Sequence, residues 1–265
     1  MPCTTPRCCW SCWARRRART MLARRNADRA GQSGQAMVEM VVVLFAALLL
    51  LFGIIQFGLV YQAKVALDYA TFEAARAGAV NHADRRAIEF ALARGLASLY
   101  TSVGSADSRS DRVRKVQAAR DRVLAEIRDD NYACIERLNP TPAAFSAYGV
   151  VGDVGDYHGP LIPNSNLLYR DATPRGGADL SIQDANLLKL RVTYCYPLYV
   201  PLIGTVIKRL QGVEPDPDPP SGWTPARPGD FQRACYAANR IPLVAQAMVR
   251  MQSAARDDSF PASCD

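Results

Sequence analysis

The chain has 265 residues and a formal net charge of +7, from 32 basic and 25 acidic side chains. Residues 1–34 hold eight arginines and one aspartate, whereas residues 35–265 hold 24 basic and 24 acidic side chains and are neutral. The net charge therefore gives no reason to expect nucleic-acid binding, and we expect no nucleic-acid partner.

The basic leader is followed by an apolar run of membrane length. No charged residue occurs from Met40 to Ala63, and a spanning helix needs about 20 predominantly apolar residues. We therefore predict a transmembrane helix over residues 35–63. A secretory signal peptide, the alternative, would have an apolar region of only about 7–15 residues with a small-residue cleavage site behind it. The arginines lie on the amino-terminal side, which predicts a cytoplasmic amino terminus and a carboxyl-terminal part outside the membrane.

The junction between leader and helix reads GQAMVE over residues 34–39. A basic leader that ends in glycine, with an acid five residues on and an apolar helix behind it, is typical of sites cut by prepilin peptidases. We predict cleavage between Gly34 and Gln35. An acid inside a membrane helix needs a partner, and we expect Glu39 to pair with the new amino group of Gln35 on a neighbouring subunit. The alternative is an interfacial glutamate favoured by the helix dipole.

Helical spacing extends beyond the membrane. The apolar helix is expected to continue through residues 62–80 as a stem, and two amphipathic helices are predicted over residues 83–100 and 111–128. The charges of the last helix are assigned to a solvated face.

Alternating residues then predict three strands, over 132–138, 187–200 and 243–251. Residues rich in Gly, Pro, Asn and Asp predict a long loop over 145–180, with room for short strands, and an extended loop over 214–229; a short helix is expected at 201–210. The predicted fold class is α+β: a long amino-terminal transmembrane and stem helix, a helical region and a small antiparallel sheet. The expected divisions are 1–34, 35–63, 64–130 and 131–265.

The eight cysteines form two groups. Those in the leader include a Cys-x-x-Cys spacing, but a redox or zinc site needs a folded setting that an arginine-rich leader lacks. The later four predict two disulfides in an oxidising compartment, with three possible pairings: Cys134, Cys195, Cys235 and Cys264. Because Cys134 and Cys195 both face away from the apolar side of their strands, we expect them to pair across the sheet, which leaves Cys235 for Cys264. Free buried thiols are the alternative.

No pattern of catalytic residues is evident. The two histidines, His82 and His158, stand apart from any triad or metal-ligand spacing, and the sequence has no nucleophile elbow or phosphate-binding glycine loop. We expect no enzyme activity, no cofactor and no metal.

The GQAMVE junction, the apolar helix and the segment AARAG at 74–78 resemble the TadE-like family, and the segments 185–197 and 241–253 look like carboxyl-terminal blocks of the same family. The chain departs from the family where a proline is often found, near Phe45. A start at Met21 instead of Met1 would give a leader of the family's compact length.

The resemblance implies a minor pseudopilin of the Tad/Flp tight-adherence pilus system. Its partners would be the inner membrane, a prepilin peptidase, other pseudopilins and Tad pilus assembly components. A signal-anchored periplasmic enzyme or binding domain unrelated to pili is the alternative, but it explains the anchor alone. Secretion ATPase and prepilin peptidase genes nearby would favour the pseudopilin.

Overall fold

The computed structural model describes residues 33–102, 104, 108–128, 132–200, 204, 229–261 and 264, with the backbone alone at residues 33–36. Residues 1–32 of the leader lie outside the described residues, with its four cysteines and Met21, and so do most of the segments 201–210 and 214–229. The chain divides into two compact units between Ile54 and Ile55, inside the first described helix.

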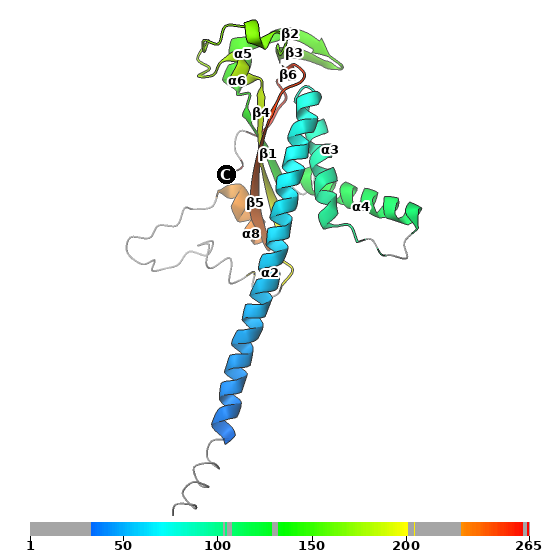
Figure 1. The fold of residues 1–265 in the computed structure, drawn as a ribbon, viewed down its shortest axis with the longest axis vertical. Helices are drawn as coiled ribbons and strands as arrows, with labels where there is room; N and C mark the ends of the chain where they lie inside the picture. Colours follow the sequence, from blue (N-terminus) through cyan, green and yellow to red (C-terminus); the bar gives the residue numbers. More distant parts are fainter. Residues whose placement is uncertain are drawn as a thin grey trace, which may run out of the picture. The chain divides into compact units, whose positions relative to one another are not determined.

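Helix α2 (Ser33–Val80) is the longest element, with 48 residues (Figure 1). No proline interrupts it, and leucine and alanine, which are strong helix formers, recur along it. Its carboxyl-terminal part buries one face, on which Ala63, Leu67, Ala70 and Ala74 are at most 1% exposed. Positions three or four apart share one side of a helix. The prediction that the helix continues as a stem through residues 62–80 is confirmed.

Helix α3 (Arg85–Leu96) packs beside this stem, and α4 (Arg109–Arg128) follows it in the chain. Helix α3 is capped by Asp84, whose side chain accepts a hydrogen bond from the backbone N–H of Arg86. A Cβ added to Gly95 would lie 2.6 Å from the Cβ of Ala70, so the backbones of α3 and α2 approach closely there. The 3₁₀ turn η1 (Ala97–Leu99) follows, and helix α4 then buries an apolar side with Val123 and Ile127.

The larger sheet is antiparallel, with strand order β1-β4-β5, from β1 (Ala133–Asn139), β4 (Leu187–Pro197) and β5 (Arg240–Arg250). Helix α8 (Asp230–Ala237) precedes β5. Alternate residues of β4 are fully buried on one face of this sheet, and they belong to the same core as the buried face of α2: Leu188, Leu190, Val192 and Tyr194.

A second antiparallel sheet has the order β2-β3-β6, from β2 (Val150–Val154), β3 (Tyr157–Ile162) and β6 (Ala255–Arg256). Three short helices lie in the same part of the chain: α5 (Pro142–Tyr148), η2 (Leu167–Tyr169) and α6 (Ile182–Ala185). Tyr148, the last residue of α5, donates from its hydroxyl to the carbonyl of Leu180, two residues before α6, over 2.7 Å.

The predicted α+β class is confirmed, with two small antiparallel sheets where one was expected. The predicted helices correspond to α3 and α4 and the three strands to β1, β4 and β5, although β5 begins three residues early, at Arg240. The assignment of the α4 charges to a solvated face is wrong at Glu126, which is 3% exposed.

Candidate membrane anchor and assembly segment

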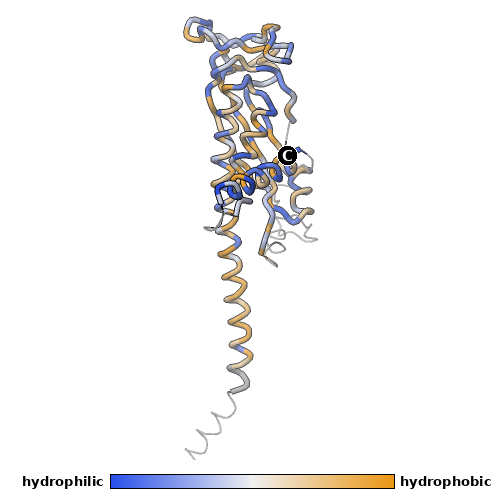
Figure 2. Tube along the Cα trace, turned by 90° about the vertical axis from the view of Figure 1, so that its right-hand side faces the viewer, coloured by the Kyte–Doolittle hydropathy of each residue, from blue (hydrophilic) through white to orange (hydrophobic). Residues whose placement is uncertain are grey.

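The amino-terminal part of α2 presents apolar side chains in every direction. Between Met37 and Ile55 most large hydrophobic side chains are at least 44% exposed, and Figure 2 shows hydrophobic residues along this stretch. In the part of the chain that the structure describes, α2 is the one helix long and apolar enough to cross a membrane. A helix that is hydrophobic all round and has no protein around it is suited to lipid.

Gln56 is the first side chain along the described part of α2 to be buried, at 1% exposure. Its Oε1 accepts a hydrogen bond of 2.9 Å from the backbone N–H of Val200, just after β4. Contacts between α2 and the rest of the folded chain therefore begin at Gln56. The preceding 19 residues, Met37–Ile55, are about 28 Å long as a helix, close to the roughly 30 Å hydrocarbon thickness of a bilayer.

The predicted cleavage and assembly residues lie at the start of α2. Gly34 and Gln35 fall in its first turn, where the backbone alone is described. Glu39 lies one turn further on, and its side chain is exposed. Among residues 37–261 that the structure describes, no side chain or backbone group forms a hydrogen bond or ion pair with the Glu39 carboxylate. The described part of the chain therefore offers no partner for this carboxylate.

Four cysteines form two disulfides, but the expected pairing is wrong. Cys134 is bonded to Cys264, with their Cα atoms 5.8 Å apart, and Cys195 is bonded to Cys235, with a Cα separation of 5.4 Å. One bridge ties the carboxyl terminus to β1, and the other ties α8 to β4.

The register of the sheet explains the error. Cys134 does face the same side as Cys195, but its direct neighbour on β4 is Thr193. Cys195 is the diagonal neighbour, and Cα atoms in that relation are roughly 7–8 Å apart, beyond the usual range for a disulfide. A shift of two residues therefore decides the pairing.

A buried polar cluster, which sequence reasoning missed, fixes α4 to the sheet. Glu126 Oε2 accepts hydrogen bonds from the hydroxyls of Tyr194 and Tyr100, and Glu126 Oε1 lies 3.3 Å from the guanidinium of Arg240. Burial raises the pKa of both the Tyr194 and Tyr100 hydroxyls, so both stay protonated. Each of these side chains has a partner within the cluster, which therefore acts as a structural joint between α4 and the sheet.

A second buried carboxylate supports the carboxyl-terminal disulfide. Glu136 is 2% exposed and accepts hydrogen bonds from the backbone N–H of Cys264 and from Arg191, the latter over 3.3 Å. Alternation in β1 places Glu136 on the same face as Cys134. The burial of Glu136 was not predicted from the sequence.

Metal chemistry has no visible support in the described residues. No group of three or more His, Cys, Asp or Glu side chains there is arranged to hold a metal ion. His82 has a structural contact, because its Nδ1 lies 2.9 Å from the carbonyl oxygen of Ala254 at the end of the stem.

Comparison with known proteins identifies one region. Residues 34–76 match the model of the family described as TadE-like protein. The match contains the predicted cleavage junction, Glu39 and most of α2, and it ends before the two carboxyl-terminal segments expected to resemble the family. No curated protein and no solved structure matches the chain.

Proposed function

We propose that this membrane-anchored chain, whose residues 34–76 are a TadE-like segment, is a minor pseudopilin required for assembly of a Tad-type pilus. The observation that carries the proposal is the position of Glu39. It is an acid that has no partner among the described residues, at the start of an exposed apolar helix and five residues after a glycine.

The bilayer is spanned by Met37–Ile55 in this proposal. These residues match the hydrocarbon thickness in length, and Gln56 next to them is already held by Val200. A polar side chain that pairs with the folded part marks a natural upper edge for the span. The transmembrane helix then ends about two turns before Ala63.

The leader sets the orientation. Its eight arginines lie on the amino-terminal side of the span, and positive charge favours the cytoplasmic side. The folded part is then periplasmic in a bacterial inner membrane. Its two disulfides fit that compartment, because disulfides persist in oxidising surroundings and are rare in the cytosol.

Glu39 is the assembly residue in this proposal. Cleavage after Gly34 would create an amino group at Gln35, about one helical turn from Glu39 on the same helix. On a neighbouring subunit, that amine and the Glu39 carboxylate would neutralise each other inside the membrane. Each helix thereby supplies one half of the pair and requires the other half from its neighbour, which favours an ordered assembly.

Amino-terminal sequencing of the mature protein tests the processing step directly. In cells with an active prepilin peptidase, we expect Gln35 as the first residue, and an intact leader would refute the proposal. Gly34→Val should block cleavage because a branched side chain crowds the scissile peptide. Gly31→Val, three residues earlier in the same leader, is the matched control and should still be cut.

A further inference from the structure

The larger sheet has an open edge along β5. The strand order β1-β4-β5 leaves β5 paired with β4 on one side, and no described strand pairs with its other side. The register runs without interruption over all 11 residues, from Arg240 opposite Pro197 to Arg250 opposite Leu187. Open edges present unpaired N–H and C=O groups and are usually covered.

The hydrogen-bond pattern shows which residues face the open side. The N–H of Cys195 donates to Tyr132 on the β1 side, so odd-numbered residues of β4 bond toward β1 and even-numbered ones toward β5. In the register of the two strands, the even β4 residues lie opposite odd residues of β5. The even β5 residues therefore direct their backbone groups outward: Val244, Gln246, Met248 and Arg250.

Within the described ranges, no group forms a hydrogen bond with the backbone of these four residues outside the ladder. Pro242, another even residue of β5, has no N–H to donate, and proline is found in strands where that group would face an open edge. The edge thus offers four donors, spaced two residues apart, to an incoming strand.

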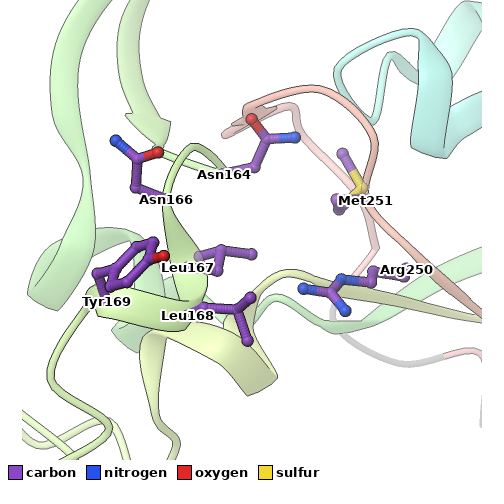
Figure 3. Close-up of a pocket in the computed structure, with 7 residues that line it drawn as sticks. All are labelled: Asn164, Asn166, Leu167, Leu168, Tyr169, Arg250 and Met251. Atoms are coloured by element: carbon purple, nitrogen blue, oxygen red, sulfur yellow. The ribbon is translucent and has the colours of Figure 1, made fainter.

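The side chains along this edge are also open. Val244 and Met248 are 40% and 60% exposed, whereas the intervening Ala245 and Ala247 are buried. Arg250, the last of the four outward-facing residues, also lines a pocket of about 290 Å³ together with Leu168, Tyr169 and other residues (Figure 3).

The pocket adds apolar surface and a charge. Leu168 and Tyr169 are 90% and 91% exposed, and Figure 3 shows the Arg250 guanidinium pointing toward Leu168. No described residue pairs with that guanidinium. The edge and the pocket together offer a row of backbone groups, an apolar side and one cation at the end.

A second copy of the chain does not fit this edge. Strand β5 begins beside the carboxyl-terminal end of β4, where the N–H of Val200 donates to Gln56 of α2. It ends two residues before Gln252, whose N–H donates to the carbonyl of Ala79, near the end of α2. Strand β5 therefore runs in the same direction as the Gln56–Val80 part of α2. Two copies joined by antiparallel β5 edges would have these parts of α2 opposed, which does not suit two chains that the proposed function anchors in one membrane.

We propose that the open edge of β5 binds an extended segment of a different envelope protein as a fourth strand. Its side chains would be apolar opposite Val244 and Met248 and acidic opposite Arg250. Main-chain hydrogen bonds supply affinity in this mode of recognition, and alternate side chains supply specificity. The inference needs the membrane anchorage of α2 from the proposed function and does not need cleavage or pilus assembly.

A labelled peptide of sequence ESVSTSVS is a direct probe. Laid antiparallel on β5, it places glutamate opposite Arg250 and valines opposite Met248 and Val244. With the full chain in detergent micelles, we expect saturable binding by fluorescence anisotropy. We also expect slower amide exchange at the four outward-facing residues, with no change at Leu243, Ala245 and Ala247. No binding up to millimolar peptide would overturn the proposal.

Gln246→Pro separates the backbone from the side chain. A proline here removes an outward donor and spares the ladder with β4, so the fold should persist. We expect at least about fivefold weaker peptide binding, the effect of one lost hydrogen bond, and more if the ring obstructs the strand. Gln246→Ala keeps the N–H and should bind within about twofold of wild type. Equal binding by both variants would reject strand addition.

Charge exchange tests the end of the site. Arg250→Glu should weaken binding of ESVSTSVS and favour the peptide KSVSTSVS, and an unchanged preference would refute the acidic assignment. If the purified chain is instead a dimer that Gln246→Pro converts to a monomer, the edge is occupied by a second copy and the proposal is wrong. Sequencing of the mature amino terminus is unaffected by any of these results, so the two proposals fail separately.

Discussion

The two parts of helix α2 differ in where their side chains find partners. From Gln56 to Val80, one face is lined by small residues and buried, and Gly95 of α3 approaches Ala70 closely. From Met37 to Ile55, large apolar side chains are exposed all round. The carboxyl-terminal part of this continuous helix therefore packs against its own chain, whereas the apolar side chains of its amino-terminal part need lipid or other subunits to cover them.

The difference lies in side-chain size as much as in polarity. The stem uses alanine and glycine where other elements approach, which lets backbones come close and leaves little room for change. At Gly53 and Gly58, in the amino-terminal part and next to it, an added Cβ would meet nothing within 4 Å. Substitutions should consequently affect assembly in the amino-terminal part and folding in the carboxyl-terminal part, and four predictions test that division.

The largest expected effect is on assembly. Glu39→Ala would leave the Gln35 amine of a neighbour unpaired inside the membrane, and one unpaired buried charge costs up to several kcal/mol. We expect cleavage and membrane insertion to persist and piliation to be lost. Pilus counts by electron microscopy, beside immunoblots of membrane fractions, measure both.

Glu39→Asp is the control for the charge. It retains the carboxylate at a shorter reach and should give intermediate piliation. Normal piliation in Glu39→Ala would rule out the pairing mechanism and leave Glu39 as a helix-start residue.

Removal of the disulfides should affect only the folded part. In the loop-closure treatment, the bridge from Cys134 to Cys264, with a sequence separation of 130, stabilises by about 5 kcal/mol, and the bridge from Cys195 to Cys235, with a separation of 40, by about 4 kcal/mol. Thermal unfolding of double serine variants should show both losses. Insertion of α2 should not change.

Single variants test the pairing itself. Cys134→Ser should release one thiol, at Cys264, when the denatured chain is labelled without reductant and mapped by mass spectrometry. Labelling of Cys195 in that variant would support the cross-strand pairing and contradict the structure.

A glycine comparison gives a smaller effect. A Cβ at Gly95 would lie 2.6 Å from the Cβ and 2.7 Å from the Cα of Ala70, and such overpacking typically costs about 1–3 kcal/mol. We expect Gly95→Ala to lower the free energy of unfolding by about 2 kcal/mol in denaturant titrations. Gly58→Ala meets no atom within 4 Å and should be neutral or slightly stabilising, since alanine is the better helix former. Equal losses would show that the close approach to Ala70 carries no cost.

The sequence predicted the features that depend on nearby residues. Apolar runs and helical spacing located α2, α3 and α4, and alternation located β1, β4 and β5, because these signals repeat within a few residues. The junction at Gly34 and Glu39 is equally local, and the family match covers it.

The features that were missed depend on register and on distant neighbours. The disulfide pairing follows from Cys134 lying opposite Thr193, which no local pattern contains. Burial of Glu126 requires Tyr194 and Arg240, which lie 68 and 114 residues away in the sequence. The open edge of β5 likewise follows from strand order, which the spacing of strands along the chain does not determine.

The smallest expected effect is at Gln56, where the two parts of α2 meet. Gln56→Leu removes the acceptor for the Val200 N–H, and a buried donor left unpaired costs about 1–3 kcal/mol. It also removes the Gln56 Nε2 group, which is buried without a hydrogen-bond partner, so part of that cost is recovered. We expect a net loss of about 1 kcal/mol in the unfolding free energy, measured by denaturant titration in micelles. Gln56→Glu keeps an acceptor for Val200 but adds a buried negative charge, and should be more destabilising at neutral pH than in acid. If Gln56→Leu instead leaves the unfolding free energy unchanged and amide exchange at Val200 is also unchanged, the packing contacts of α2 with the folded chain begin later, at Ala63. The apolar span free of protein contacts would then extend beyond Ile55 to Ala63, the end of the transmembrane segment predicted from the sequence.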